Sequence, residues 1–127
     1  MEEYSPTTLF LAEIKQRLAP LGIPVFFSTK ELENYERDLG EHLDEVIVIG
    51  TYTSVERNAQ SGHLMEDISQ MVDIYLPIGD RAHAEEVKFK ARKLLGRQVT
   101  NNAEITVDDS LGREIYRIFM RVSKTLI

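Results

Sequence analysis

Three residues have the types that metal-dependent nucleases use. Asp73 lies in an alternating apolar segment, and Glu86 and Lys88 follow it in the order Glu-Val-Lys. In such enzymes the acidic groups hold a divalent ion that positions the attacking water. Their Glu-x-Lys normally lies on a strand beside the aspartate, whereas helical spacing places Glu86 and Lys88 on the exposed side of a predicted helix. The match is therefore weak, and a nuclease is the least favoured function.

The other residues that could do chemistry fit structural roles better. His42, His63 and His83 lie in separate segments and form no HExxH or His-x-x-x-His pair, so the sequence predicts no metal site. The Asp108-Asp109 pair precedes a serine and a glycine, which is typical of a turn. The sequence contains no Gly-x-Ser-x-Gly elbow, Walker loop or Gly-x-Gly-x-x-Gly motif. We expect a protein that is not an enzyme and needs no cofactor.

The composition is typical of one globular domain, with 43% hydrophobic and 28% charged residues, so we expect residues 1–127 to fold as a unit. The absence of cysteine excludes disulfides and thiolate chemistry. A net charge of -6 argues against broad phosphate neutralisation of nucleic acid, although a local basic patch is compatible with it. No apolar run is long enough to cross a bilayer, and the start Met1-Glu2-Glu3 lacks the pattern of a secretory signal. We therefore expect no membrane partner.

The clearest structural prediction is a strand over residues 71–76 followed by a helix over residues 81–96. The strand alternates apolar and more polar positions, which is the period of a sheet with one buried face. Asp80 is a typical N-cap, and Gly96 is a typical helix end. The apolar stripe that would pack on the sheet consists of Ala84, Val87, Ala91, Leu94 and Leu95.

Similar patterns predict the first half of the fold. A helix begins at Ser5-Pro6, and a short strand follows at residues 23–27. Residues 28–44 form either a short helix or an ordered loop. A continuous apolar strand over residues 45–53 is expected in the middle of the sheet, buried on both faces. The inner face of the first helix consists of Phe10, Ile14, Leu18 and Leu21.

The second half adds a further strand region and a hairpin. Residues 64–76 form one long bent strand or two strands with a bulge, and residues 103–107 pair with residues 114–125. The inner face of the last strand consists of Tyr116, Ile118, Met120 and Val122. This order predicts an α+β fold with a mostly antiparallel or mixed sheet of about five strands and two main helices packed on one face.

One aromatic residue of the predicted 81–96 helix lies away from the apolar stripe. At 3.6 residues per turn, Phe89 falls in a row with Glu85 and Lys93, opposite Val87. Either a neighbouring loop covers Phe89, or the side chain belongs to a subunit contact, because aromatic residues are enriched in interface cores.

The order of these elements resembles the small tail-completion proteins of long-tailed bacteriophages, in particular the tail terminator group. The resemblance rests on an N-terminal helix before Ile23-Pro24-Val25, the apolar strand at residues 46–49, the strand at residues 72–75, the charged amphipathic helix, and the turn at residues 109–113 before Ile115-Tyr116-Arg117. It covers most of residues 7–125 and is a likeness of element order, without a signature motif. The charged residues 29–44 have no clear counterpart in that family.

The resemblance implies a structural virion protein without catalytic residues. Such a protein closes into a hexameric ring on the end of the tail tube, stops tube growth and presents a surface to the head connector. Its partners are then copies of itself, the tail tube protein and the head connector or neck protein. It is assembled in the cytoplasm of the bacterial host and ends in the tail or neck of the virion.

A ring requires two different contact surfaces on each subunit. The candidates for these contacts are the row Glu85, Phe89 and Lys93 and the strand face with Arg117 and Arg121, which would meet acidic side chains across the interface. The polar segment at residues 55–63 is either an ordinary hairpin tip or a loop that reaches the tube or connector. Its candidate contact residues are Arg57, Asn58, Gln60 and His63. A small ligand-binding or regulatory α+β domain is the alternative function.

Overall fold

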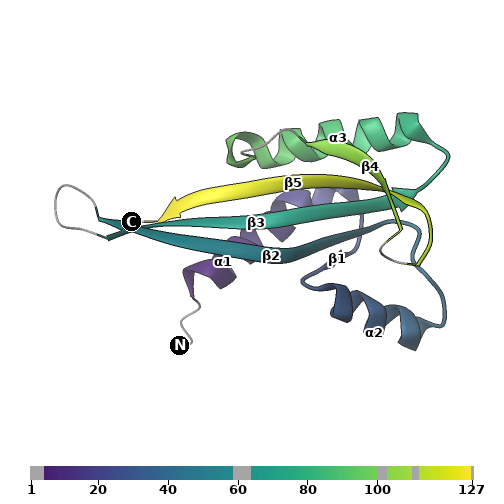
Figure 1. Ribbon diagram of the computed structural model, residues 1–127, viewed down its shortest axis with the longest axis horizontal. Helices are drawn as coiled ribbons and strands as arrows, with labels where there is room; N and C mark the ends of the chain where they lie inside the picture. The colour runs from purple at the N-terminus through teal and green to yellow at the C-terminus, as the bar shows by residue number, and fades with distance from the viewer. Residues whose placement is uncertain (1–4, 59–63, 100–102, 110–111, 127) are drawn as a thin grey trace.

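In the computed structural model, the described residues form a five-stranded mixed sheet with helices on both faces (Figure 1). The structure describes residues 5–58, 64–99, 103–109 and 112–126, and only the backbone of residues 6–7, 51–58, 64–67, 98 and 125–126. The helices are α1 (Pro6–Leu18), α2 (Thr29–Leu39) and α3 (Arg81–Leu95), with short 3-10 turns η1 (Ala19–Leu21) and η2 (Gly96–Gln98). The strands are β1 (Val25–Phe26), β2 (Val46–Asn58), β3 (Leu64–Pro77), β4 (Glu104–Asp108) and β5 (Ile115–Leu126). No helix in these ranges is long and apolar enough to span a membrane.

The strands lie in the order β1-β2-β3-β5-β4. Only the β1–β2 pair among them is parallel, and the other three pairs are antiparallel. This arrangement confirms the predicted α+β class and mixed sheet of about five strands. The hairpin predicted near the C-terminus is also confirmed, because β4 pairs with β5 from Glu104 opposite Phe119 to Asp108 opposite Ile115.

One face of the sheet is covered by α1 and α3, as predicted for the two main helices. Most of the apolar stripe of each helix is buried: Phe10, Ile14 and Leu18 from α1, and Ala84, Val87, Ala91 and Leu95 from α3. The other two predicted members, Leu21 and Leu94, are only partly buried. The sheet side of this core consists of Ile47, Ile49, Ile68, Val72, Ile74, Leu76, Ile118, Met120 and Val122. Alternation along each strand places these residues on a single face, so two amphipathic helices suffice to cover it.

The opposite face is covered at one end by α2, which Figure 1 shows on the other side of the sheet from α3. Of the two forms left open for residues 28–44, the helix is therefore right. Leu32 of α2 is fully buried against the sheet. Its cluster also contains Phe26, Val46, Val48, Tyr75 and Ile115. Because both faces are covered here, the start of β2 is apolar at consecutive positions, as predicted for a central strand.

The middle hairpin is longer than the side-chain pattern predicted. The expectation of a polar loop from residue 55 onwards is wrong for residues 55–58, which continue β2 and pair with residues 64–67 of β3. Backbone hydrogen bonds sustain this pairing whether or not the side chains are apolar. Residues 64–77 form one strand, and the irregularity lies in β2, where the register shifts between Ile49 and Thr51. Figure 1 shows β2 and β3 extending together well beyond α3.

Each of the three helices begins at a side-chain cap. Ser5, Ser28 and Asp80 each accept a hydrogen bond from the backbone amide three residues later. At α3 the Asp80 carboxylate lies 3.0 Å from the His83 amide. These bonds satisfy amides that the first turn of a helix leaves without a partner.

Replacing Asp80 by alanine is expected to lower the free energy of unfolding by about 1 kcal/mol, because the cap hydrogen bond to His83 is lost. Urea denaturation measures the change. The matched control is Asp80→Asn, which keeps an acceptor oxygen and should stay within a few tenths of a kcal/mol of the wild type. Equal losses in both variants would show that the charge, rather than the cap, matters.

Candidate functional site

The sheet face opposite α1 and α3 carries a polar cluster beyond the end of α2. Arg117 of β5 donates a hydrogen bond from Nε to one carboxylate oxygen of Asp73 on β3 at 2.9 Å, and its Nη2 lies 2.9 Å from the same oxygen in an ion pair. Its Nη1 lies 3.4 Å from a carboxylate oxygen of Asp108 on β4. The guanidinium also lies over the Phe119 ring, 5.3 Å from its centroid. One arginine therefore ties together three adjacent strands.

Burial and charge act against each other in this cluster. Burial raises the pKa of Asp73 above its ordinary value, and the hydrogen bond and charge of Arg117 only partly offset this effect. Burial has the largest single effect on Arg117 and would lower its pKa. The hydrogen bond and charge of Asp73, together with the charges of Tyr75 and Asp108, outweigh it, so the pKa is raised. Arg117 thus stays charged and stabilises the ionised carboxylate of Asp73, which burial disfavours.

The predicted contact residues Arg117 and Arg121 have different surroundings in the structure. Arg117 has two carboxylate partners within its own chain, so its first role is to hold the sheet together. Arg121 lies on the same face of β5 and is exposed. Whether either residue touches another subunit stays a prediction.

The geometry separates the three residues that could have suggested a nuclease. Asp73 lies on the face of β3 away from α3 and is bound by Arg117. Glu86 and Lys88 lie on α3, where Glu86 pairs with Lys90 at 3.7 Å and Lys88 pairs with Glu85 at 3.5 Å. The sheet therefore stands between the aspartate and the Glu-x-Lys set. Within the described ranges, no group of three acidic or histidine side chains is placed to hold a metal ion.

Two of the three histidines are paired with carboxylates. Nε2 of His83 lies 2.5 Å from a carboxylate oxygen of Glu45, and Nδ1 of His42 lies 3.4 Å from Glu36. His63 falls outside the described residues. The same is true of Gln60, a second candidate from the predicted loop. Its other two candidates, Arg57 and Asn58, lie at the end of β2, where only the backbone is described.

The outer face of α3 carries the predicted row of Glu85, Phe89 and Lys93. Phe89 is 63% exposed, so no described loop covers it. Glu85 pairs with Arg81 at 3.1 Å, and this hydrogen bond lowers the pKa of the Glu85 carboxyl. A shallow hollow of about 410 Å³ lies beside the row, lined by Glu85, Lys88, Phe89, Arg92, Lys93, Gly96 and Val99. A large aromatic side chain in water at a hollow is typical of a contact surface.

This end of α3 is also strongly basic. Residues 88–97 contain five basic side chains and no acidic one. We call Lys88, Phe89, Lys90, Arg92, Lys93 and Arg97 the basic face. A second shallow hollow, between η1 and α3, is lined by Pro20, Leu21, Lys90, Lys93 and Leu94. The chain as a whole is acidic, so this face is the local basic patch that the composition left open.

The surface of α2 and the following loop has the opposite charge. Residues 29–45 contain seven acidic side chains and two basic ones. The acidic residues, which we call the acidic surface, are Glu31, Glu33, Glu36, Asp38, Glu41, Asp44 and Glu45. Tyr35 and Leu39, one turn apart on α2, are 49% and 47% exposed. We did not predict this surface as a site, although the density of acidic residues around Tyr35 and Leu39 was a signal that could have found it.

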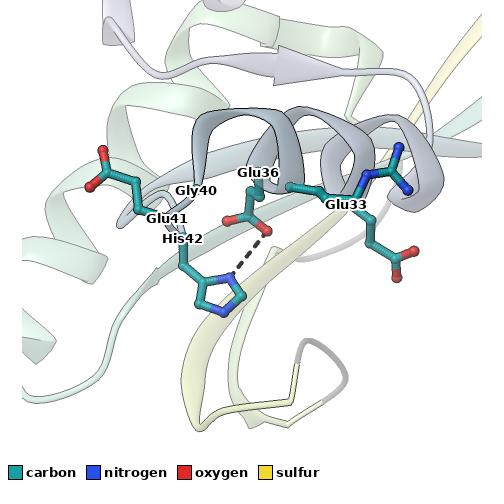
Figure 2. Close-up of a pocket in the computed structure, with 6 residues that line it drawn as sticks. Glu33, Glu36, Gly40, Glu41 and His42 are labelled. Atoms are coloured by element: carbon teal, nitrogen blue, oxygen red, sulfur yellow. Dashed lines mark ion pairs between the residues drawn. The ribbon is translucent and has the colours of Figure 1, made fainter.

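A shallow hollow of about 340 Å³ lies on the acidic surface, between α2 and the loop after it (Figure 2). It is lined by Glu33, Glu36, Arg37, Gly40, Glu41 and His42. Glu36 holds the loop in place, because its carboxylate accepts a bond from the Leu43 amide at 2.6 Å. Arg113 at the start of the last hairpin strand donates to the Leu43 carbonyl at 2.8 Å. These two bonds hold the backbone of Leu43, directly after the loop residues that line the hollow.

No protein-family model matches the chain, and a comparison with curated proteins finds no match. The likeness to tail terminator proteins therefore stays a prediction from element order. The features of the structure that bear on function are the two charged surfaces and the exposed aromatic residue.

Proposed function

We propose that the protein is a structural subunit of a long-tailed phage virion, which closes into a ring on the end of the tail tube and joins the tube to the head connector. The observation that carries this proposal is Phe89, 63% exposed on the outer face of α3 beside Lys93 and a hollow. Leaving a large aromatic ring in water is unfavourable, and contact with another protein removes that exposure.

The distribution of charge supports a ring in particular. A ring uses heterologous contacts, in which two different surfaces of each subunit meet. The basic face on α3 and the acidic surface on α2 are two such surfaces, and they lie on opposite sides of the sheet (Figure 1). A symmetric dimer would instead need one surface that complements itself.

The extended hairpin supports contact with a second component. The backbone of β2 and β3 stays paired as far as Asn58 and Leu64, beyond α3 (Figure 1). This segment contains Arg57 and Asn58, the candidates for contact with the tail tube or the connector. The ring is expected to be a hexamer and to have no catalytic activity.

The mass in solution tests the proposal. Light scattering after size exclusion, over a range of protein concentration and with purified tail tubes added, should give a species of about six subunits, and negative-stain images should show a central hole. The expected assembly appears either in the free protein or on the tube. A protein that stays monomeric even with tubes would contradict the proposal, and so would a compact dimer, which would favour the regulatory domain.

A further inference from the structure

We infer that the basic face of one copy of the chain docks on the acidic surface of the next copy, with Phe89 seated at the hollow beside α2. This inference rests on the proposed ring and names the two surfaces that form it. The partner is a second copy of this chain.

Charge complementarity selects the acidic surface as the partner. The basic face has five basic side chains between residues 88 and 97, of which Lys88 and Lys90 pair with Glu85 and Glu86 one turn earlier on α3. The acidic surface has seven acidic side chains against two basic ones. Neighbouring basic faces would repel each other, as would neighbouring acidic surfaces, so copies cannot pair like with like. Both surfaces can be covered when the basic face of one copy contacts the acidic surface of another copy.

The apolar groups match as well. Phe89 is the exposed aromatic side chain of the basic face, and Tyr35 and Leu39 are half-exposed on α2. The hollow on the acidic surface is lined by other residues of α2 and the loop after it, among them Gly40, where an added Cβ atom would meet nothing within 4 Å. Backbone atoms of this segment are thus open to approach by Phe89, and Glu33 and Glu41 of the same lining can pair with lysines of the basic face.

The placement of the two surfaces determines the type of assembly. The helices α2 and α3 cover opposite faces of one sheet. A contact from α3 of one copy to α2 of the next leaves one basic face and one acidic surface free at the two ends of a pair. Such a head-to-tail contact repeats, and it produces a closed ring when the rotation between neighbouring copies closes.

Cross-linking between single-cysteine variants tests the contact directly, because the chain has no cysteine of its own. Glu86→Cys places a thiol one turn before Phe89, and Arg37→Cys places one in the lining of the hollow. Neither substitution weakens the attraction between the basic face and the acidic surface, because Glu86→Cys removes an acidic side chain from α3 and Arg37→Cys removes a basic one from α2. Mixing the two variants with a short bismaleimide should give at least about tenfold more cross-linked pairs than either variant alone.

The matched control pairs Glu86→Cys with Leu9→Cys, whose side chain on α1 is 56% exposed. This mixture should show no excess of cross-linked pairs. An equal yield from the control mixture, or a higher yield from Glu86→Cys alone, would overturn the inference.

Charge reversal supplies the second measurement. The α3 variant Lys90→Glu with Lys93→Glu and the α2 variant Glu33→Lys with Glu41→Lys should each weaken self-association by about tenfold or more. Combining all four substitutions should restore it, since the charges are then exchanged across the same contact. Rising salt should also weaken the wild-type association, because exposed charges are screened over about 8 Å at physiological salt.

The outcomes separate this inference from the proposed function. Rings of wild-type size in both reversed variants would overturn the α3-to-α2 contact and leave the proposed ring standing. A wild-type chain that neither self-associates nor cross-links, with or without tail tubes, would overturn both. Loss of rings in each reversed variant and recovery in the combined variant is the result expected.

Discussion

Replacing Arg117 by alanine is expected to lower the free energy of unfolding by about 2 kcal/mol at neutral pH. Removing one partner of a buried ion pair commonly costs about 3–5 kcal/mol, because the other charge is left without compensation. The value here is reduced because the Arg117 side chain is 32% exposed. Asp73, 13% exposed, would keep its burial but lose its hydrogen bond and its ion pair with the guanidinium.

The loss should depend on pH in a definite direction. Burial raises the pKa of Asp73 above its ordinary value of 3.8, so the folded protein binds the Asp73 proton more tightly than the unfolded chain does. The stability that this protonation contributes is fully present below pH 3.8 and is lost as pH rises through the raised pKa. Without Arg117 that pKa rises further, because the interactions that lower it are gone. The stability difference between variant and wild type should therefore be large at pH 7 and small near pH 3.

Urea denaturation at several pH values measures this difference. The matched control is Arg121→Ala, an exposed arginine on the same strand and face, for which we expect a change below about 0.5 kcal/mol at every pH. An Arg117→Ala variant whose loss stays constant from pH 3 to pH 7 would show that packing of the side chain, rather than its charge, supports the sheet.

The second large effect is expected at Leu32. Replacing Leu32 by alanine should lower the free energy of unfolding by about 3 kcal/mol, which is typical of a fully buried leucine. Leu32 is the buried residue of α2, and the apolar cluster beneath it is the smaller of the two in the described residues. The loss should thus weaken the attachment of α2 more than the packing of α1 and α3.

Amide hydrogen exchange distinguishes local from global effects in this variant. The amides of α2 should exchange faster in Leu32→Ala, while those of α3 should change only as far as global stability falls. The control Leu39→Ala, at a position that is 47% exposed, should remain within about 0.5 kcal/mol of the wild type. A loss at Leu39 as large as that at Leu32 would contradict the observed orientation of α2.

Some features of the surfaces were predicted from local sequence alone. The 3.6-residue period of α3 places Val87 and Phe89 on opposite sides of the helix, and the structure confirms that Val87 lies on the buried side. Asp80 and Gly96 predicted the two ends of the helix correctly. These features depend on interactions within a few residues of the chain, so the sequence carries them directly.

Other features depend on segments that are distant in the chain. Asp73, Asp108 and Arg117 meet because β3, β5 and β4 are neighbours in a particular register, which the pattern of any one strand does not specify. The continuation of β2 through residues 55–58 likewise depends on backbone pairing with β3. The polar side chains of those residues gave no indication of it.

By itself, the sequence determined the α+β class, the two helices of the main face, the caps Ser5 and Asp80, and the side of α3 on which Phe89 lies, because periodicity and capping are local. The structure decided that no described loop covers Phe89. Only the tertiary structure decided that α2 covers the opposite face of the sheet, which gives the molecule a basic and an acidic side. The physical reason is that burial of Leu32 could be satisfied on either face, and the choice depends on where Phe26, Val48 and Tyr75 already form an apolar surface.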